Sequence, residues 1–111
     1  QNITMQRYGM LINIRPEKIE VYKELHAAVW PEVLKMITEC NIRNYSIYLK
    51  DNSLFSYFEY IGNYFDGDMA LMAADPITQK WWDVCKPCQE AVENRKDGEW
   101  WANMLEVFHL D

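Results

Sequence analysis

Two histidines, His26 and His109, are the side chains in this sequence that titrate near neutral pH without perturbation. Around His26, residues recur at helical spacing on one face, namely Ile19, Tyr22 and Val29. This pattern fits a core histidine, but Tyr22 lies one turn before His26, which places a phenol beside the imidazole. A break at Trp30-Pro31 follows, where a helix face can open into a pocket, so a core histidine and a functional residue both remain possible for His26. His109, near the end of the chain, is interpreted as a polar residue at a strand end.

The adjacent pair Trp81 and Trp82 is the second candidate feature. Neighbouring residues on a helix point about 100° apart, so a single core does not easily take up both rings. One ring can pack while the other lines an opening, and the alternative is that both are core or dimer-contact aromatics. Aromatic walls suit sugars, because their C–H faces stack on rings while their hydroxyls form hydrogen bonds. A second pair, Trp100 and Trp101, is assigned to packing or to a dimer seam.

Two predicted strands contain further residues of interest. Tyr45 and Tyr48 are separated by an odd number of positions, so we expect one to face the helices and the other to face away from them. Glu59 lies within an apolar strand, where a charge needs a partner.

Three cysteines occur, at positions 40, 85 and 88, and the last two form a Cys-x-x-Cys motif. The motif follows a predicted helix rather than a strand, which favours ordinary thiols over a redox pair. Metal binding is the remaining alternative, but the two histidines lie far away in the sequence, so we predict no metal. An odd number of cysteines and the lack of a basic-then-apolar leader favour a reducing, cytoplasmic compartment.

The composition excludes several classes of function. The 111 residues carry a net charge of −6, which disfavours binding to nucleic acid or to an anionic membrane surface. No apolar stretch approaches the roughly 18 to 20 residues of a membrane span. Gly-rich phosphate loops and a Gly-x-Ser-x-Gly motif are missing, which disfavours dinucleotide-binding, P-loop and serine-hydrolase classes. Half of the residues are hydrophobic and 14% are aromatic, so many rings must enter a core, an interface or a pocket.

These residues are positioned by a predicted α+β domain that spans residues 1–111, with residues 1–4 interpreted as a leader or a cloning remnant. Strands are expected at 7–14, 44–49, 54–61 and 105–110, with a turn of about four residues between the middle two. Helices are expected between the first two strands, with a break at Trp30-Pro31, and over 65–85, with a break at Asp75-Pro76. Residues 90–99 are polar and predict a loop. The order β-α-β-β-α-β is typical of a ferredoxin-like sandwich.

The strand at 54–61 predicts a homodimer, because both of its faces carry large apolar or aromatic side chains. One face has Leu54, Phe58 and Tyr60, and the other has Phe55, Tyr57 and Ile61. Helices cover only one face of the sheet in a two-layer sandwich, and large exposed apolar patches are unusual on monomers. A second copy of the chain, packed sheet face to sheet face, would cover the other.

Four segments of this chain resemble the L-rhamnose mutarotase family, in the same order and over nearly the whole chain. They are residues 22–32 (YKELHAAVWPE), 44–49 (NYSIYL), 81–82 (WW) and 106–110 (EVFHL). The resemblance implies a dimeric ferredoxin-like fold of the α/β-barrel type and a cofactor-free mutarotase that acts on the anomeric carbon of a monosaccharide. It also implies that His26 is the acid–base residue and that Tyr22, Tyr45, Trp81 and Trp82 line the sugar site.

Three segments, at 65–70, 85–88 and 99–102, depart from the best-known rhamnose enzymes and are more similar to a branch linked to L-fucose. The expected substrate is therefore a 6-deoxyhexose, L-rhamnose or L-fucose.

The mechanism we expect from the sequence begins with His26 as proton donor to the ring oxygen. Tyr22 and Tyr45 hold sugar hydroxyls and relay the second proton, while Trp81 and Trp82 stack on the sugar and shelter its methyl group. Two alternatives share the fold. One is a cofactor-free or haem-dependent monooxygenase, and the other is a small-molecule binding domain without catalysis.

Overall fold

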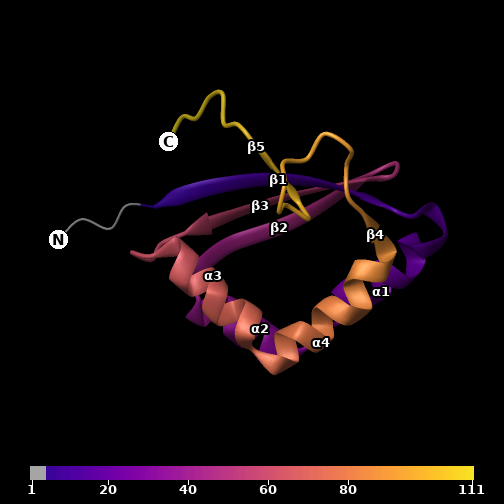
Figure 1. Cartoon of the computed structure of the whole chain (residues 1–111), viewed down its shortest axis with the longest axis horizontal. Helices are drawn as coiled ribbons and strands as arrows, with labels where there is room; N and C mark the ends of the chain where they lie inside the picture. The colour runs from indigo at the N-terminus through magenta and orange to yellow at the C-terminus, as the bar shows by residue number, and fades with distance from the viewer. Residues whose placement is uncertain (1–4) are drawn as a thin grey trace.

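The computed structural model describes residues 5–111, so residues 1–4 lie outside the described part of the chain (Figure 1). One antiparallel sheet contains β1 (Gln6–Ile14), β2 (Ile42–Lys50), β3 (Ser53–Tyr60), β4 (Gln89–Glu90) and β5 (Ala102–Met104). The helices are α1 (Ile19–Ala27), α2 (Pro31–Glu39), α3 (Phe65–Ala74) and α4 (Pro76–Cys85), with short 3-10 turns at Pro16–Lys18 and Lys86–Cys88. Figure 1 shows the four helices together on one side of the sheet.

The strand order confirms the predicted ferredoxin-like fold. The strands run β2-β3-β1-β4, with β5 also paired to β1, so the two central strands are those that precede α1 and α3. All pairings are antiparallel. The hairpin between β2 and β3 is tighter than expected, because only Asp51 and Asn52 separate the strands and Asp51 adopts a positive φ of 52°.

Prolines and one cap divide the helices at the predicted positions. Pro31 and Pro76 each occupy the first turn of a helix, where a missing N–H group costs nothing. Trp30, directly before Pro31, has an extended backbone, which ends α1 and lets α2 begin in a new direction. Asp75 caps α4 by accepting hydrogen bonds from the backbone and hydroxyl of Thr78, both at 2.8 Å. His26 consequently lies in the last turn of a short helix, next to a bend.

The core lies between the sheet and the helices. A first cluster of buried residues joins β1 and β3 to α1, α2 and α4, and a second joins β2 and β3 to α2 and α3. On β3, Leu54, Phe58 and Tyr60 are buried within this layer, whereas Phe55 on the opposite face remains 39% exposed. Both faces of β3 are therefore apolar, as the sequence predicts, but the helices cover only one of them.

The last predicted strand is wrong in its position. Residues 102–104 form β5, with Gly9 opposite Met104 and Leu11 opposite Ala102, whereas residues 105–111 form no strand. The alternating apolar pattern of 105–110 resembles a strand, but the tail leaves the sheet on the side opposite the helices (Figure 1). Four of its apolar residues are 79–89% exposed, namely Leu105, Val107, Phe108 and Leu110. A strand needs a partner as well as a pattern, and among residues 5–111 this segment pairs with no strand.

Within residues 5–111, no helix has both the length and the apolar character that a membrane crossing would require.

Candidate active site

His26 and Tyr22 lie side by side on α1, as their spacing predicts. Their rings stack at a centroid distance of 4.1 Å, and Tyr22 is only 4% exposed. His26 Nδ1 lies 2.8 Å from the backbone carbonyl oxygen of Tyr22. A carbonyl oxygen only accepts hydrogen bonds, so Nδ1 carries the hydrogen and donates it. The other ring nitrogen, Nε2, keeps a lone pair that can take up a proton.

The surroundings of His26 favour its neutral form. Partial burial of the imidazole lowers its pKa below the ordinary value of 6.5, and the hydrogen bond to the carbonyl of Tyr22 opposes this only in part. Most His26 side chains are consequently uncharged at pH 7. A neutral imidazole with a fixed tautomer is suited to accept a proton from a substrate hydroxyl.

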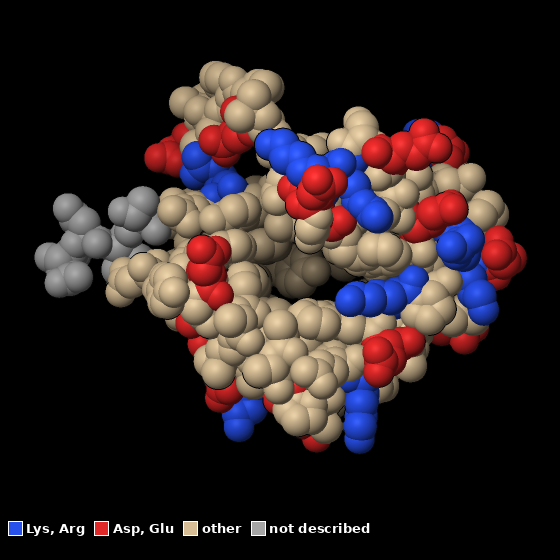
Figure 2. Space-filling model, viewed as in Figure 1, with Lys and Arg blue, Asp and Glu red and all other residues tan. Residues whose placement is uncertain are grey.

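A cavity of about 130 Å³ adjoins these two residues. Tyr22, Lys23 and His26 line it from α1, and Ile47, Leu49 and Leu54 line it from the paired strands β2 and β3. Its polar groups therefore come from the helix, and its apolar wall comes from the sheet. Figure 2 shows that the molecule is hollowed between the sheet and the helices.

Trp81 closes the other side of His26. Its ring packs edge-on against His26 at 5.3 Å and against Trp30 at 5.2 Å, and it is only 6% exposed. Trp82 points elsewhere and packs against both core clusters, while Lys86 Nζ lies 5.4 Å from its ring centroid. The two rings thus point in different directions, as helical spacing requires. Both pack against the core, however, and neither is among the residues that line the cavity of about 130 Å³. The sequence indicated Trp30 only as a helix break, so its contact with Trp81 was missed.

A β-bulge sets the direction of Tyr45. The register with β3 shifts between Arg43 and Ser46, where Asn44 has a positive φ of 51°. Tyr45 packs edge-on against the buried ring of Phe58, on the helix-covered face of the sheet. Tyr48 lies on the outer face, where it stacks with Phe55, so the two tyrosines face opposite sides as predicted.

The phenols of Tyr22 and Tyr45 stay protonated at neutral pH. Although 42% of Tyr45 is accessible, the protein around its hydroxyl desolvates the charged form and raises the pKa to about 12. Burial also raises the pKa of Tyr22 strongly, and negative charge on Tyr45 would raise it further. Both phenols can therefore donate a hydrogen bond or a proton to a bound molecule.

Gln89 and Trp100 extend the site to a buried chain of hydrogen bonds that the sequence did not indicate. Gln89 Nε2 lies 3.1 Å from Tyr22 Oη, and Gln89 Oε1 accepts from Trp100 Nε1 at 2.7 Å. Trp100 also packs against the first core cluster, in agreement with its assignment to packing. A buried glutamine requires partners, but burial of a single polar residue after Cys88 cannot be read from its sequence context.

The Cys-x-x-Cys motif has the properties of ordinary thiols. Cys85 and Cys88 are free and buried, at the end of α4 and in the 3-10 turn that follows it. Burial raises the pKa of Cys85 to about 12, which suppresses the reactive thiolate. Among residues 5–111, no group of three or more His, Cys, Asp or Glu side chains is arranged to hold a metal ion.

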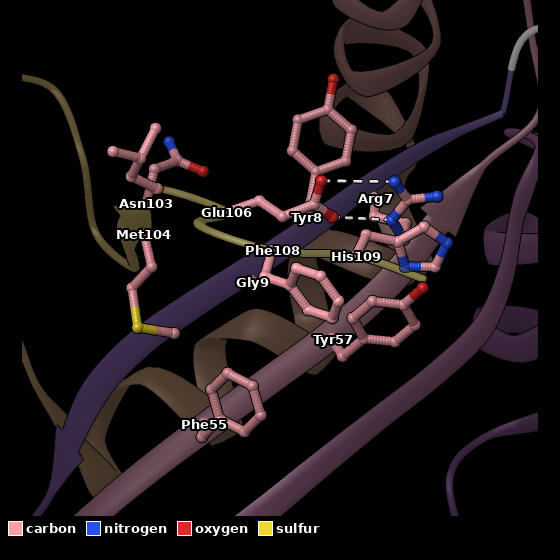
Figure 3. A pocket seen from close by; sticks show the side chains of 11 residues that line it. Arg7, Tyr8, Gly9, Phe55, Tyr57, Asn103, Met104, Glu106, Phe108 and His109 are labelled. Atoms are coloured by element: carbon pink, nitrogen blue, oxygen red, sulfur yellow. Dashed lines mark hydrogen bonds and ion pairs between the residues drawn. The ribbon is translucent and has the colours of Figure 1, made fainter. Parts of the chain in front are cut away.

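The outer face of the sheet carries a separate, larger cavity, of about 590 Å³, beneath the C-terminal tail. Figure 3 shows its lining, in which Phe55 and Tyr57 of β3 face Met104 and Phe108. His109 belongs to this cavity and not to the site at His26. The two histidines therefore lie on opposite sides of the sheet.

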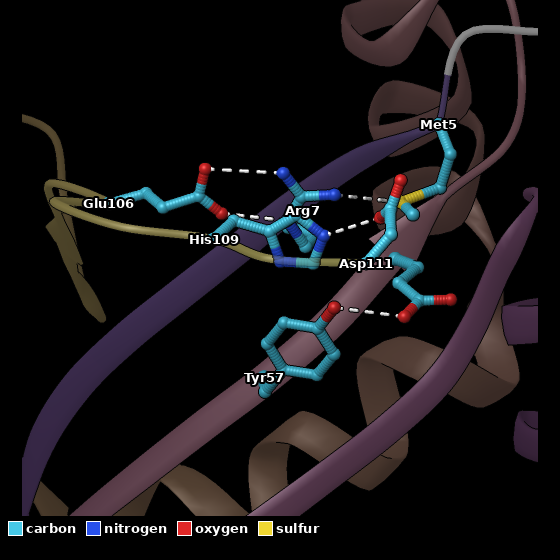
Figure 4. A network of polar contacts seen from close by, with 7 residues as sticks. Met5, Arg7, Tyr57, Glu106, His109 and Asp111 are labelled. Carbon is cyan, nitrogen blue, oxygen red and sulfur yellow. Dashed lines mark hydrogen bonds and ion pairs between the residues drawn. The ribbon is translucent and has the colours of Figure 1, made fainter.

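Polar side chains hold the tail to this outer face (Figure 4). Arg7 Nε of β1 donates to Glu106 at 2.7 Å, which connects the tail to the sheet, whereas the contact of 2.7 Å between His109 Nε2 and the carboxylate of Asp111 lies within the tail. Glu59 has the partners that its position requires, because it accepts hydrogen bonds from Asn44 at 2.6 Å and from Tyr57 at 2.8 Å. Those two hydrogen bonds lower the pKa of Glu59.

Nearly the whole chain matches one family of known proteins. The family model described as L-rhamnose mutarotase matches residues 7–110. Over 109 residues the chain is 36% identical to an L-rhamnose mutarotase from Phocaeicola vulgatus and 33% identical to one from Oceanobacillus iheyensis, and each match covers 96% of this chain and all of the relative. The chain belongs to the L-rhamnose mutarotase family. The family resemblance predicted from the sequence is thereby confirmed, and with it the class of enzyme, an isomerase.

Solved structures share the fold of this mutarotase family member. An L-rhamnose mutarotase from Formosa agariphila superposes with a TM-score of 0.74 at 22% identity. The tetracenomycin F2 cyclase from Streptomyces glaucescens, a type-II polyketide cyclase, superposes with a TM-score of 0.68 at 9% identity. Each match covers 96% of this chain and 99% of the other. At these identities the likeness establishes the fold alone.

Proposed function

We propose that this protein interconverts the α and β anomers of a 6-deoxyhexose, L-rhamnose in the first place and L-fucose as the alternative. The observation that carries the proposal is the imidazole of His26, held between the rings of Tyr22 and Trp81 with Nε2 free beside a cavity. Membership of the L-rhamnose mutarotase family supports the same activity.

The reaction needs only two proton transfers. When the ring opens, the bond between the anomeric carbon and the ring oxygen breaks, the anomeric hydroxyl loses a proton and the ring oxygen gains one. The open-chain aldehyde then turns about the bond next to the carbonyl, and the hydroxyl attacks its other face with the same transfers reversed. No electrons or atoms are gained or lost overall. We therefore propose that the reaction requires no cofactor.

In this proposal His26 acts first as a base. Its neutral form, with Nδ1 bound to the carbonyl of Tyr22, leaves Nε2 to take the proton of the anomeric hydroxyl. A protonated phenol, from Tyr22 or Tyr45, donates the proton that the ring oxygen gains. Ring closure returns both protons. The sequence suggested the opposite first step, with His26 as donor to the ring oxygen, but the lowered pKa of the histidine favours a neutral base at the start of the reaction.

The walls of the site suit an uncharged sugar. We propose that Trp81 stacks on the sugar face, while Trp82 supports it from the shared core. Ile47 and Leu49 offer an apolar surface for the methyl group of a 6-deoxy sugar. The net charge of −6 does not hinder such a neutral substrate.

NMR saturation transfer between anomers tests the proposed activity directly. We expect the wild-type protein to accelerate exchange of L-rhamnose and His26→Ala to remove most of that acceleration. Parallel samples with L-fucose and L-galactose rank the sugars. Saturable binding without faster exchange would instead support a binding domain, and a Soret band on adding haem, or oxygen uptake with a phenolic substrate, would support a monooxygenase.

We further propose that the protein is a homodimer joined through the outer face of its sheet. Tyr48, Phe55 and Met104 leave apolar surface on this face, and the tail beside it exposes four more apolar residues. An isologous contact would bury both sets at once, because each copy presents the same sheet and the same tail. The tail would then gain a partner, which it does not have within residues 5–111 of one chain.

Light scattering coupled to size-exclusion chromatography tests the dimer. The wild-type chain is expected at twice its own mass, and Phe55→Asp is expected to shift it towards the monomer. Leu71→Asp is a matched control, because Leu71 is an exposed leucine on α3, away from this face. A wild-type monomer, or equal dissociation in both variants, would contradict the proposed interface.

We also propose a reducing, cytoplasmic compartment, which the three free and buried cysteines support.

A further inference from the structure

Gln89 connects a loop far along the chain to the candidate active site. It is 5% exposed, at the start of β4, and both ends of its amide have a partner. Trp100 lies on one side of the amide and Tyr22 on the other, 67 residues away in the sequence from Gln89. Trp100 itself is covered on one face by the guanidinium of Arg95, 5.9 Å from its ring centroid.

The direction of these hydrogen bonds is fixed by chemistry. The indole N–H of Trp100 can only donate, so the amide oxygen of Gln89 must face Trp100. The amide nitrogen of Gln89 then faces Tyr22 and donates to its hydroxyl oxygen. Tyr22 therefore accepts from Gln89, and its own hydrogen must point away from the amide.

We propose that Gln89, oriented by Trp100, is a positioning residue that commits the hydroxyl hydrogen of Tyr22 to the bound sugar. The inference rests on the proposed function, since it assigns a partner to that hydrogen. Tyr22 lines the cavity beside His26, so a hydroxyl that already accepts inside the protein is left to donate towards the substrate. Donation from Gln89 also lowers the pKa of Tyr22, which partly offsets the effect of burial and makes the phenol a better acid.

A double-mutant cycle separates this role from a purely structural one. Gln89→Leu is expected to lower kcat/KM roughly tenfold, because the loss of one buried hydrogen-bond partner typically has an effect of about this size. In a Tyr22→Phe background the same change should cost less than about twofold, because the hydroxyl on which Gln89 acts is gone. Equal losses in both backgrounds would overturn the proposal. Gln79→Leu is the matched control, since Gln79 is exposed on α4 and is expected to leave kcat/KM unchanged.

Gln89→Glu gives a second, pH-dependent readout. A carboxylate at this position can only accept, so it would draw the hydrogen of Tyr22 away from the sugar, whereas the protonated acid can still donate to Tyr22. The activity of this variant relative to wild type is expected to fall as pH rises. The titratable groups that face Tyr22 are His26 on its own helix, Tyr45, Cys85 and Cys88. All are present in both proteins, so the ratio isolates the new group, and a ratio independent of pH would contradict the proposal.

A ligand-free measurement distinguishes failure of this inference from failure of the proposed function. The ¹³Cζ resonance of Tyr22 reports the hydrogen bond at its hydroxyl without any sugar. It is expected to shift in Gln89→Leu and in Trp100→Phe, which keeps the glutamine but frees its amide to turn, and to stay constant in Gln79→Leu. An unchanged resonance in the first two variants would overturn the inference even if the enzyme is an active mutarotase. A wild-type protein that fails to accelerate anomer exchange would overturn both the proposed function and the role inferred for Gln89.

Discussion

The two histidines of this chain lie on opposite sides of one sheet and have different surroundings. His26 is half-buried between two aromatic rings, and its Nδ1 is tied to a backbone carbonyl. His109 lies on an irregular tail, where its Nε2 meets the carboxylate of Asp111. Burial favours a neutral imidazole at the first position. His26 is therefore suited to accept a proton from a bound molecule, whereas His109 makes its contact with another residue of the tail.

The two sides of the sheet also differ in what stabilises them. The helix side is packed within one chain, with its buried polar atoms partnered by residues such as Gln89 and Thr78. The outer side has apolar residues that remain exposed, and a tail that an ion pair between Arg7 and Glu106 connects to the sheet. We infer that the first side determines the fold and the chemistry of each chain, and that the second determines its association with another copy.

The largest difference is expected between the two alanine variants of the histidines. His26→Ala should lower the catalysed exchange rate by about 10²- to 10⁴-fold, because a group of this kind contributes on that scale. His109→Ala should change it by less than about twofold, because His109 lies on the other side of the sheet. NMR saturation transfer on both variants, with circular dichroism as a check of folding, makes the comparison. Similar losses in the two variants would refute the assignment of the chemistry to the helix side.

A smaller effect is expected on the free energy of unfolding. On the helix side it should be independent of protein concentration, whereas on the outer side it should depend on it. Trp81→Ala should lower the free energy of unfolding by about 3–5 kcal/mol, because it leaves a large cavity in the core of each chain. Phe108→Ala should instead act through association, so its effect should depend on protein concentration. Urea denaturation at several protein concentrations separates the two. If the Phe108→Ala midpoint shifts equally at every concentration, the outer side does not act through a dimer.

The smallest effect is expected at the ion pair between Arg7 and Glu106. The side chains of Arg7 and Glu106 are 22% and 47% exposed, so solvent and salt reach the pair, and it contributes little to stability. Arg7→Met should leave the exchange rate unchanged and lower the melting temperature slightly at low salt. The difference should disappear at high salt. A large loss of exchange activity in this variant would show that the outer face takes part in the chemistry.

Local rules predicted much of the fold. Pro31 and Pro76 predicted the boundaries between α1 and α2 and between α3 and α4, because proline restricts its own backbone and that of the residue before it. Helical spacing placed Tyr22 beside His26, and the odd separation of Tyr45 and Tyr48 placed them on opposite faces.

What the sequence missed depends on distant partners. The tail at 105–110 has the pattern of a strand, but pairing depends on whether a free edge lies within reach. Gln89 gave no signal, because its two partners are 67 and 11 residues away. It directly follows one of the segments that depart from the best-known rhamnose enzymes, and Trp100 lies in another. In the sequence those departures bear only on the choice of substrate, whereas the structure brings them together next to Tyr22.

The central claim is that His26 works as a neutral base, and the pH dependence of the wild-type enzyme tests it most directly. Because burial lowers the pKa of His26, the base form is present above a midpoint that lies below pH 6.5, and it is lost as the pH falls through that midpoint. Exchange rates measured by saturation transfer between about pH 5 and about pH 8 should rise with pH through that midpoint and level off above it. The same midpoint is expected in His109→Ala. Exchange that is fastest at the acid end and falls as pH rises would contradict the claim, because the active form of His26 would then be the protonated one.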